Sequence, residues 1–180
     1  MGGEKSEKLI DLLTRFLGDS LMDGATLKSD EKSTVIMIPR RTENASWNMA
    51  LGMFEESSLV TIVSTAVEVV RDRLKDARDL VSYINGSSFM TSWVIDEDEL
   101  TINANSYYVV PSNNFSGLPL VIDDHTKQVD QWLPALHRLN STNHHPKRIF
   151  MASLKQYYSR TGVDLSIEDK EGDDEDTQAT

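Results

Sequence analysis

Acidic side chains that could bind a metal ion or transfer protons are densest at residues 96 to 99, where the sequence reads Asp-Glu-Asp-Glu. A calcium-binding loop places its carboxylates at alternate positions and includes a glycine for the sharp bend, and this segment has neither feature. A general acid–base pair needs carboxyl groups that are partly removed from water. The cluster lies between two apolar segments whose alternation predicts a β-hairpin. We therefore expect a solvated turn with its carboxylates in water.

The four histidines show no spacing that is typical of a metal site. His137 and His144 are seven residues apart, and Asp123 and Asp124 beside His125 are interpreted as residues near a helix start. The chain has no cysteine, and it contains neither a glycine-rich phosphate loop nor a G-x-S-x-G motif. The sequence thus predicts no catalytic, cofactor-binding or metal-binding residue, and we expect a protein that is not an enzyme and has no cofactor.

Length and charge limit the classes of protein to which the chain could belong. The chain has 180 residues and a formal net charge of −11, and residues 164 to 180 hold eight acidic groups and one lysine. We expect one α+β domain over residues 1–167 and a disordered acidic tail over 168–180. The sequence has no basic stripe, so we expect no nucleic-acid binding. No apolar run approaches the roughly 18 residues of a membrane span and no export leader is present, so we expect a cytoplasmic protein without membrane contact.

The first part of the chain predicts one helix and three strands. The helix spans about residues 6 to 22, with Ser6 as N-cap and Gly18 or Gly24 at its end. Strands follow at 34 to 38, 47 to 53 and 59 to 70, and Pro39 closes the first in the manner of an edge strand. If residues 55 to 58 form the loop, the second and third strands pair as Met53 with Val60, Leu51 with Ile62, Met49 with Ser64 and Trp47 with Ala66.

The second part predicts a helix, a hairpin and two more helices. Apolar residues from Val70 to Ile84 recur at helical spacing, and Gly86 follows at the position of a C-terminal cap. With a loop at 96 to 99, Ile95 pairs with Leu100, Trp93 with Ile102 and Thr91 with Ala104. Residues 111 to 119 are expected to form a loop. An apolar stripe from Val129 to Leu139 predicts a helix that Pro134 either kinks or restarts, and Pro146 opens a last helix that stops near Gly162.

The last helix carries the candidate partner-binding residues. Aromatic and apolar side chains lie there between Lys147, Arg148, Lys155 and Arg160. Aromatic groups flanked by cations are typical of contact surfaces, although we favour the interpretation that this is an ordinary helix that closes the core. We select five residues as candidates for contact with a protein partner: Phe150, Leu154, Tyr157, Tyr158 and Trp132.

In order, the expected elements are helix-β-β-β-helix-β-β-helix-helix, an antiparallel sheet of about five strands with helices mainly on one face. Through "LVTIVSTAVEVV", "RDRLKDARDLVSYINGSSF" and "MTSWVIDEDELTINANSYYVV", residues 6 to 140 resemble the YbjN family, whose fold is similar to that of type III secretion chaperones. In that family a helix ends near an asparagine before the final hairpin, the place of Asn85 here. The resemblance implies a non-enzymatic homodimer that holds a segment of another protein.

The sequence therefore leaves two candidate functions. The first is a chaperone-like or regulatory protein-binding homodimer, whose open sheet would offer edges and a groove to a partner. The second is a small-ligand-binding or enzymatic α+β domain with a pocket near the 111–119 loop.

Overall fold

The computed structural model describes residues 4–18, 24–30, 32–42, 44–54 and 56–162. The elements are α1 (Glu4–Leu17), β1 (Thr26–Ser29), β2 (Ser33–Arg41), β3 (Ser46–Phe54), β4 (Leu59–Glu68), η1 (Arg71–Arg73), α3 (Leu74–Ser87), β5 (Thr91–Asp96), β6 (Thr101–Val109), η2 (Pro111–Asn113), α4 (Leu118–Ser141) and α5 (Pro146–Thr161). The fold is α+β, as predicted, with the short strand β1 added. The predicted tail and the end of the predicted domain, residues 163 to 180, lie outside the described residues.

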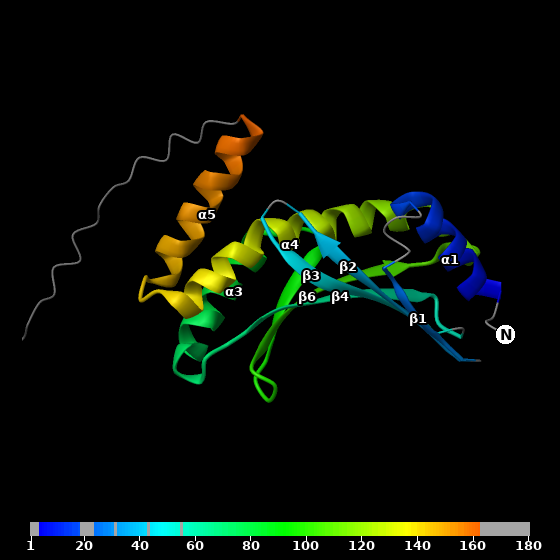
Figure 1. Ribbon diagram of the computed structural model, residues 1–180, viewed down its shortest axis with the longest axis horizontal. Helices are drawn as coiled ribbons and strands as arrows, with labels where there is room; N and C mark the ends of the chain where they lie inside the picture. Colours follow the sequence, from blue (N-terminus) through cyan, green and yellow to red (C-terminus); the bar gives the residue numbers. More distant parts are fainter. Residues whose placement is uncertain (1–3, 19–23, 31, 43, 55, 163–180) are drawn as a thin grey trace, which may run out of the picture.

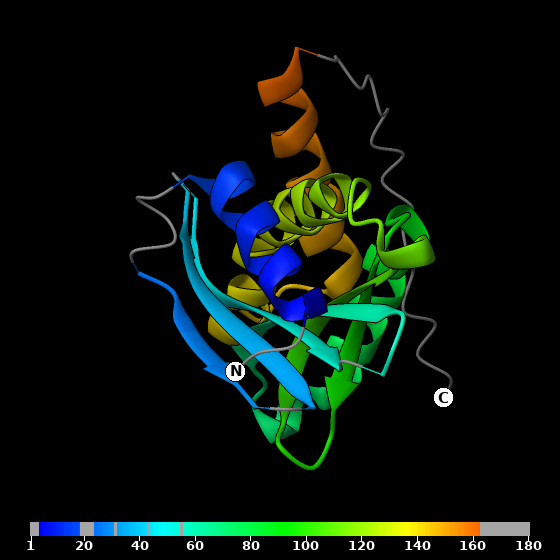
Figure 2. The same cartoon turned by 90° about the vertical axis from the view of Figure 1, so that its right-hand side faces the viewer.

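One antiparallel sheet of six strands, in the order β1-β2-β3-β4-β6-β5, forms the base of the molecule. Figures 1 and 2 show α1 and α4 on the same side of this sheet. Helix α3 packs beside β5, and α5 packs on α3 and α4 as an outer layer. The side of the sheet away from the helices is called the open face below.

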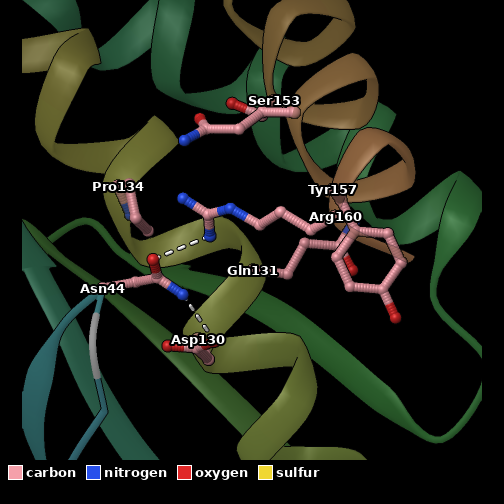
Figure 3. Close-up of a pocket in the computed structure, with 8 residues that line it drawn as sticks. Asn44, Asp130, Gln131, Pro134, Ser153, Tyr157 and Arg160 are labelled. Atoms are coloured by element: carbon pink, nitrogen blue, oxygen red, sulfur yellow. Dashed lines mark hydrogen bonds between the residues drawn. The ribbon is translucent and has the colours of Figure 1, made fainter. Parts of the chain in front are cut away.

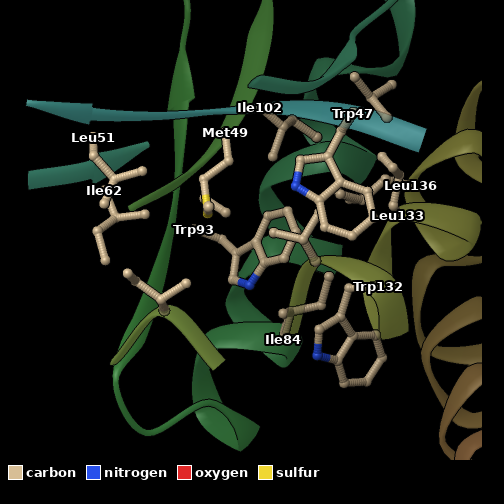
Figure 4. Packing of buried hydrophobic residues seen from close by; sticks show 14 of the residues in the cluster. Trp47, Met49, Leu51, Ile62, Ile84, Trp93, Ile102, Trp132, Leu133 and Leu136 are labelled. Atoms are coloured by element: carbon tan, nitrogen blue, oxygen red, sulfur yellow. The ribbon is translucent and has the colours of Figure 1, made fainter. Parts of the chain in front are cut away.

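The core lies between the sheet and the helices because alternate residues of each strand are apolar. Strand β3 shows this plainly, since Trp47, Met49, Leu51 and Met53 are buried while its other residues are half-buried or exposed. Helix α1 adds Leu9 and Leu13 from one face. Figure 4 shows Trp47, Trp93 and Trp132 converging here from β3, β5 and α4. No described helix is long and apolar enough to cross a membrane.

The predicted pairing of β3 with β4 is confirmed at three of its four positions. Met53 pairs with Val60, Leu51 with Ile62 and Met49 with Ser64. The ladder ends there, so the predicted pair of Trp47 with Ala66 lies beyond it. Strand β4 pairs with β6 along its whole length, with a register shift between Thr65 and Val67.

The hairpin of β5 and β6 forms, but its predicted register is wrong by two residues. Ile95 pairs with Ile102 and Trp93 with Ala104. Asp96 belongs to β5, and the turn contains residues 97 to 100, of which Leu100 has a left-handed φ of 52°. A shift of two residues preserves the faces of both strands, so the residues predicted to point inward still do.

Two other local predictions are corrected. Pro39 does not close an edge strand, because β2 continues to Arg41 and β1 lies outside it. Strand β1 pairs only with residues 34 to 37 of β2, so Pro39 lies where β2 has a neighbour on one side. Ser6 is not an N-cap: it is buried inside α1, where its Oγ lies 2.5 Å from Oγ1 of Thr34. Gly18, with φ of 80°, ends α1 as predicted.

The remaining helices differ from prediction mainly at their ends. Helix α3 continues through Gly86 to Ser87, and Val70 is an exposed residue before it. Helix α4 is one continuous helix that contains Pro134. Helix α5 begins at Pro146 and is followed by Gly162 in the left-handed conformation, both as predicted.

Candidate functional site

The acidic hairpin tip is a solvated turn, as predicted. All four carboxylates at residues 96 to 99 are exposed. Asp96 Oδ1 accepts hydrogen bonds from the backbone N–H groups of Asp98 and Glu99, at 3.1 and 3.0 Å, which ties the turn together. Arg78 of α3 donates to Glu97 at 2.7 Å across the surface. Within the described residues, no group of three or more His, Asp or Glu side chains could hold a metal ion.

A buried polar group lies between α4 and the sheet: His125 of α4 is fully buried. Its Nε2 lies 2.8 Å from Oγ of Ser64 on β4, and its Nδ1 lies 2.9 Å from Oγ of Ser106 on β6. Ser106 in turn contacts Thr91 Oγ1 at 3.0 Å, and Thr91 donates to Asp124 Oδ2 at 3.1 Å. A buried polar chain therefore joins α4 to three strands.

The donor and the acceptor of each hydrogen bond in this series follow from the bond between Thr91 and Asp124. Since the hydroxyl of Thr91 donates to Asp124, its oxygen accepts from Ser106, and Ser106 then accepts from the Nδ1–H of His125. Nε2 is left as an acceptor for Ser64. The imidazole is neutral, and burial lowers the pKa of His125 to about 4. His125 thus fastens α4 to the sheet, and its full burial keeps it from any substrate.

Of the five candidate partner-binding residues, Trp132 belongs to the core, and the half-buried Phe150 packs against it. Trp132 is only 1 % exposed, and its Nε1 donates to Gln128. The ring of Phe150 stacks on Trp132 with centroids 5.2 Å apart and planes 4° apart, and Tyr83 of α3 lies 5.6 Å from Phe150. These contacts show how α5 is fastened to α3 and α4.

The other three candidates are half-buried. Leu154 packs against the core, whereas Tyr157 and Tyr158 form an edge-to-face pair with centroids 5.5 Å apart. Tyr157 lines a cavity of about 280 Å³ between α4, α5 and the turn after β2 (Figure 3).

Figure 3 shows that this cavity is polar. Asn44 donates to Asp130 Oδ2 at 2.9 Å and accepts from Arg160 at 2.7 Å, and Thr42 also donates to Asp130. The carboxylate of Asp130 and the guanidinium of Arg160 are thus both engaged with the turn after β2. The cavity is smaller than the roughly 300 Å³ at which pockets for small molecules begin.

The side chain of Tyr108 fills the space beneath the predicted loop at 111–119. Tyr108 Oη donates to the carbonyl of Asn114 at 3.0 Å and accepts from the N–H of Gly117 at 3.2 Å. A Cβ on Gly117 would lie 3.0 Å from the Tyr108 ring, so the glycine is needed for this close approach. Tyr108 therefore occupies the space beneath this loop.

The open face of the sheet is largely uncharged over the described strands. Registers place its residues in rows that cross the strands, such as Val35–Gly52–Thr61–Tyr107 and Met37–Ala50–Val63–Asn105. Among the described residues of β2, β3, β4 and β6, this face carries charge only at one end, through Arg41 and Glu68.

Large apolar side chains are exposed to solvent on the open face. Phe54 is 64 % exposed, Val109 67 %, Tyr107 56 % and Met37 42 %. Soluble proteins seldom leave a contiguous apolar patch on a sheet face unless something binds it. The sequence carried a signal for this surface, because both alternate sets of residues in β2, β3 and β4 lack charged side chains over most of their length.

A groove runs between α3 and the outer edge of β5. Arg78, Ser82, Val94 and Glu97 are among the residues that line it. Within it, Asn85 donates to the carbonyl of Trp93 at 2.9 Å and accepts from the Trp93 N–H at 2.7 Å. Asn85 thus takes the place of a neighbouring strand at Trp93 and protects this edge from pairing there.

Searched against models of known protein families, the chain matches none, and a search of curated proteins likewise finds no match.

Proposed function

We propose that the chain is a non-enzymatic protein-binding module, chaperone-like or regulatory, that acts as a homodimer and holds a segment of a partner protein. The observation that carries this proposal is the open face, where large apolar side chains are exposed on a surface whose charges lie at its rim. Burying apolar side chains of this kind contributes about 25 cal/mol for each Å² removed from water, before the entropic cost of association is subtracted. A protein surface is the occupant that matches a flat, uncharged sheet.

The groove beside β5 gives the partner segment a separate place. Val81 and Ile95 are among the apolar residues that line it, and Arg78 with Glu97 adds an ion pair. Because Asn85 already occupies the backbone groups of Trp93, docking of side chains into the groove is favoured over extended strand pairing.

The proposal is tested by partner capture with matched variants. Ser82→Lys places a long cation in the groove, while Ser159→Lys makes the same change at an exposed position on α5. We expect a partner protein to co-purify with the wild-type chain and with Ser159→Lys in a fixed stoichiometry by native mass spectrometry, and to be lost with Ser82→Lys. Capture that is equal for all three chains would contradict the groove assignment, and no capture by any of them would contradict the function.

A ligand-binding role has its own candidate, the polar cavity at Asp130 and Arg160. A metabolite screen by thermal shift separates the two functions. Stabilisation of the wild-type chain by a small molecule, lost in Arg160→Ala and without any co-purifying protein, would favour ligand binding over the module proposed here.

A further inference from the structure

We propose that the open face is the interface of the homodimer, and that the two copies stack face to face about a two-fold axis that runs along β4. The inference rests on the proposed function and assigns one surface to the second copy. Of the residues that line the groove beside β5, Val94 lies on the open face and is covered in this arrangement, while Arg78, Ser82 and Asn85 on α3 stay free for a partner segment.

The neutrality of the open face is the first support. Each chain has a formal charge of −11, so two copies repel each other, and an uncharged contact surface adds no close contact between like charges to that repulsion. Within the described part of the chain, the charges on this face are Lys28 on β1, Arg41 and Glu68 at one end, and Asp96 on β5. All four lie at the rim, where water screens them.

The size of the surface is the second support. With an axis along β4, five strands of each copy overlap, from β2 to β5 in the order of the sheet. At about 4.8 Å between strands and 3.3 Å for each of roughly seven residues, they span about 24 by 23 Å, or roughly 550 Å² in projection. Side chains raise the accessible area above this value, toward the approximately 800 Å² per partner of a stable interface.

The third support is the fit of the rows under this symmetry. Strand β4 lies between β3 and β6, so a two-fold axis along it places each copy's β6 over the other copy's β3. Thr61 pairs with both Gly52 and Tyr107, which puts all three in one row. Tyr107 of each copy therefore lies over Gly52 of the second copy, where the missing side chain leaves room for its ring.

The neighbouring rows agree with this arrangement. Val109 lies over Phe54 of the second copy, so two of the most exposed apolar side chains cover each other. At the charged end, Arg41 on β2 lies over Asp96 on the second copy's β5, because these strands also exchange places. Glu68, on the axial strand β4, lies over Glu68 of the second copy, and the two opposed pairs of Arg41 and Asp96 at the same end offset this repulsion. Stacked sheets about 10 Å apart leave room for such side-chain contacts.

Sedimentation velocity of the purified full chain, with matched variants, tests the interface. Wild type is expected to be a dimer at micromolar concentration, with about twice the 20.3 kDa mass of one chain. Tyr107→Lys should raise the dimer Kd by about 30-fold or more, as expected for a central aromatic contact. Leu120→Lys is the control, since Leu120 is 69 % exposed on α4, away from the open face. Val109→Lys is a second interface variant, and circular dichroism verifies that each variant is folded.

Charge pairs test the symmetry itself. Met37 and Ser92 are the end members of one row, four strands apart within a chain, but the axis along β4 places Met37 over Ser92 of the second copy. Met37→Lys and Ser92→Asp should each raise the dimer Kd about tenfold, and the double variant should recover most of that loss. Four strand spacings of about 4.8 Å keep the two groups too far apart for such recovery within one chain.

The outcomes separate this inference from the proposed function. A wild-type chain that stays monomeric, or a dimer that Tyr107→Lys leaves intact, would overturn the interface, whatever protein is captured at the groove. A dimer that the open-face variants break, but that captures no partner, would support the interface and contradict the holding of a partner segment.

Discussion

Protonation of His125 should destabilise the folded chain in acid. In the fold, Nε2 accepts from Ser64 and burial excludes water, so the imidazolium would point a second N–H at a hydroxyl that already donates to it. Because burial lowers its pKa from 6.5 to about 4, the unfolded chain binds more protons than the folded chain between these two values. The stabilising contribution is therefore complete above pH 6.5 and is lost as the pH falls.

The gap between a pKa of about 4 when folded and 6.5 when unfolded sets the magnitude. Linkage gives a loss of about 2 kcal/mol by pH 5 and about 3 kcal/mol by pH 4, relative to pH 8. The variant His125→Gln keeps a donor and an acceptor but does not titrate. We expect it to be less stable than wild type at pH 8, because glutamine does not reproduce the ring, with the difference shrinking as the pH falls.

Urea unfolding of both chains at pH 4, 5, 6.5 and 8 measures this difference, and all other titrating groups cancel in the comparison. The free energy of unfolding of wild type should fall by about 3 kcal/mol more than that of His125→Gln between pH 8 and pH 4. A difference between the two chains that changes by less than about 1 kcal/mol would refute the reasoning. It would mean that His125 is not held neutral between the two serines.

Other predictions concern contacts that hold the elements together. Asn85→Ala should cost about 2 kcal/mol, because it leaves the backbone groups of Trp93 without partners, and amide exchange at Trp93 should become faster than in wild type. Gly117→Ala should lower stability by about 1–2 kcal/mol in urea unfolding, since its Cβ would press on Tyr108 at 3.0 Å, and an unchanged midpoint would mean that the loop moves freely. Phe150→Ala should cost about 2 kcal/mol through the lost stack on Trp132, while Tyr157→Ala should cost about 1 kcal/mol or less, so equal thermal shifts would contradict the packing of Phe150 against the core.

The sequence predicted the hairpin of β3 and β4 because large residues oppose small ones in a single register. The β5–β6 register was missed because the loop was placed from Asp96 onward. In the structure the carboxylate of Asp96 accepts hydrogen bonds from the amides of Asp98 and Glu99, and Leu100 adopts a left-handed φ, which moves the turn along the chain. Strand β1 was missed because its four residues, Thr-Leu-Lys-Ser, are all exposed and show no buried alternation.

The functional surfaces depend on contacts between distant residues, which local patterns do not contain. His125 was grouped with Asp123 and Asp124 at a helix start, whereas its partners Ser64 and Ser106 lie on two strands far along the chain. The aromatic residues of α5 were selected for their flanking cations, yet Phe150 faces Trp132 in the interior. The open face was overlooked because strand alternation shows which residues share a side, but only the packing of helices shows which side is left uncovered.

Hydroxyl-radical footprinting of the purified wild-type chain tests most directly whether the open face is covered by protein. Phe54, Tyr107 and Met37 report on that face, while Phe16 and Leu120, which are 42 % and 69 % exposed, report on helices elsewhere. If the face is an interface, its three reporters should become protected from oxidation as the protein concentration rises through the dimer Kd, and the two helix reporters should keep constant rates. Rates at Phe54, Tyr107 and Met37 that do not change with concentration and match their exposure in a single chain would contradict the account.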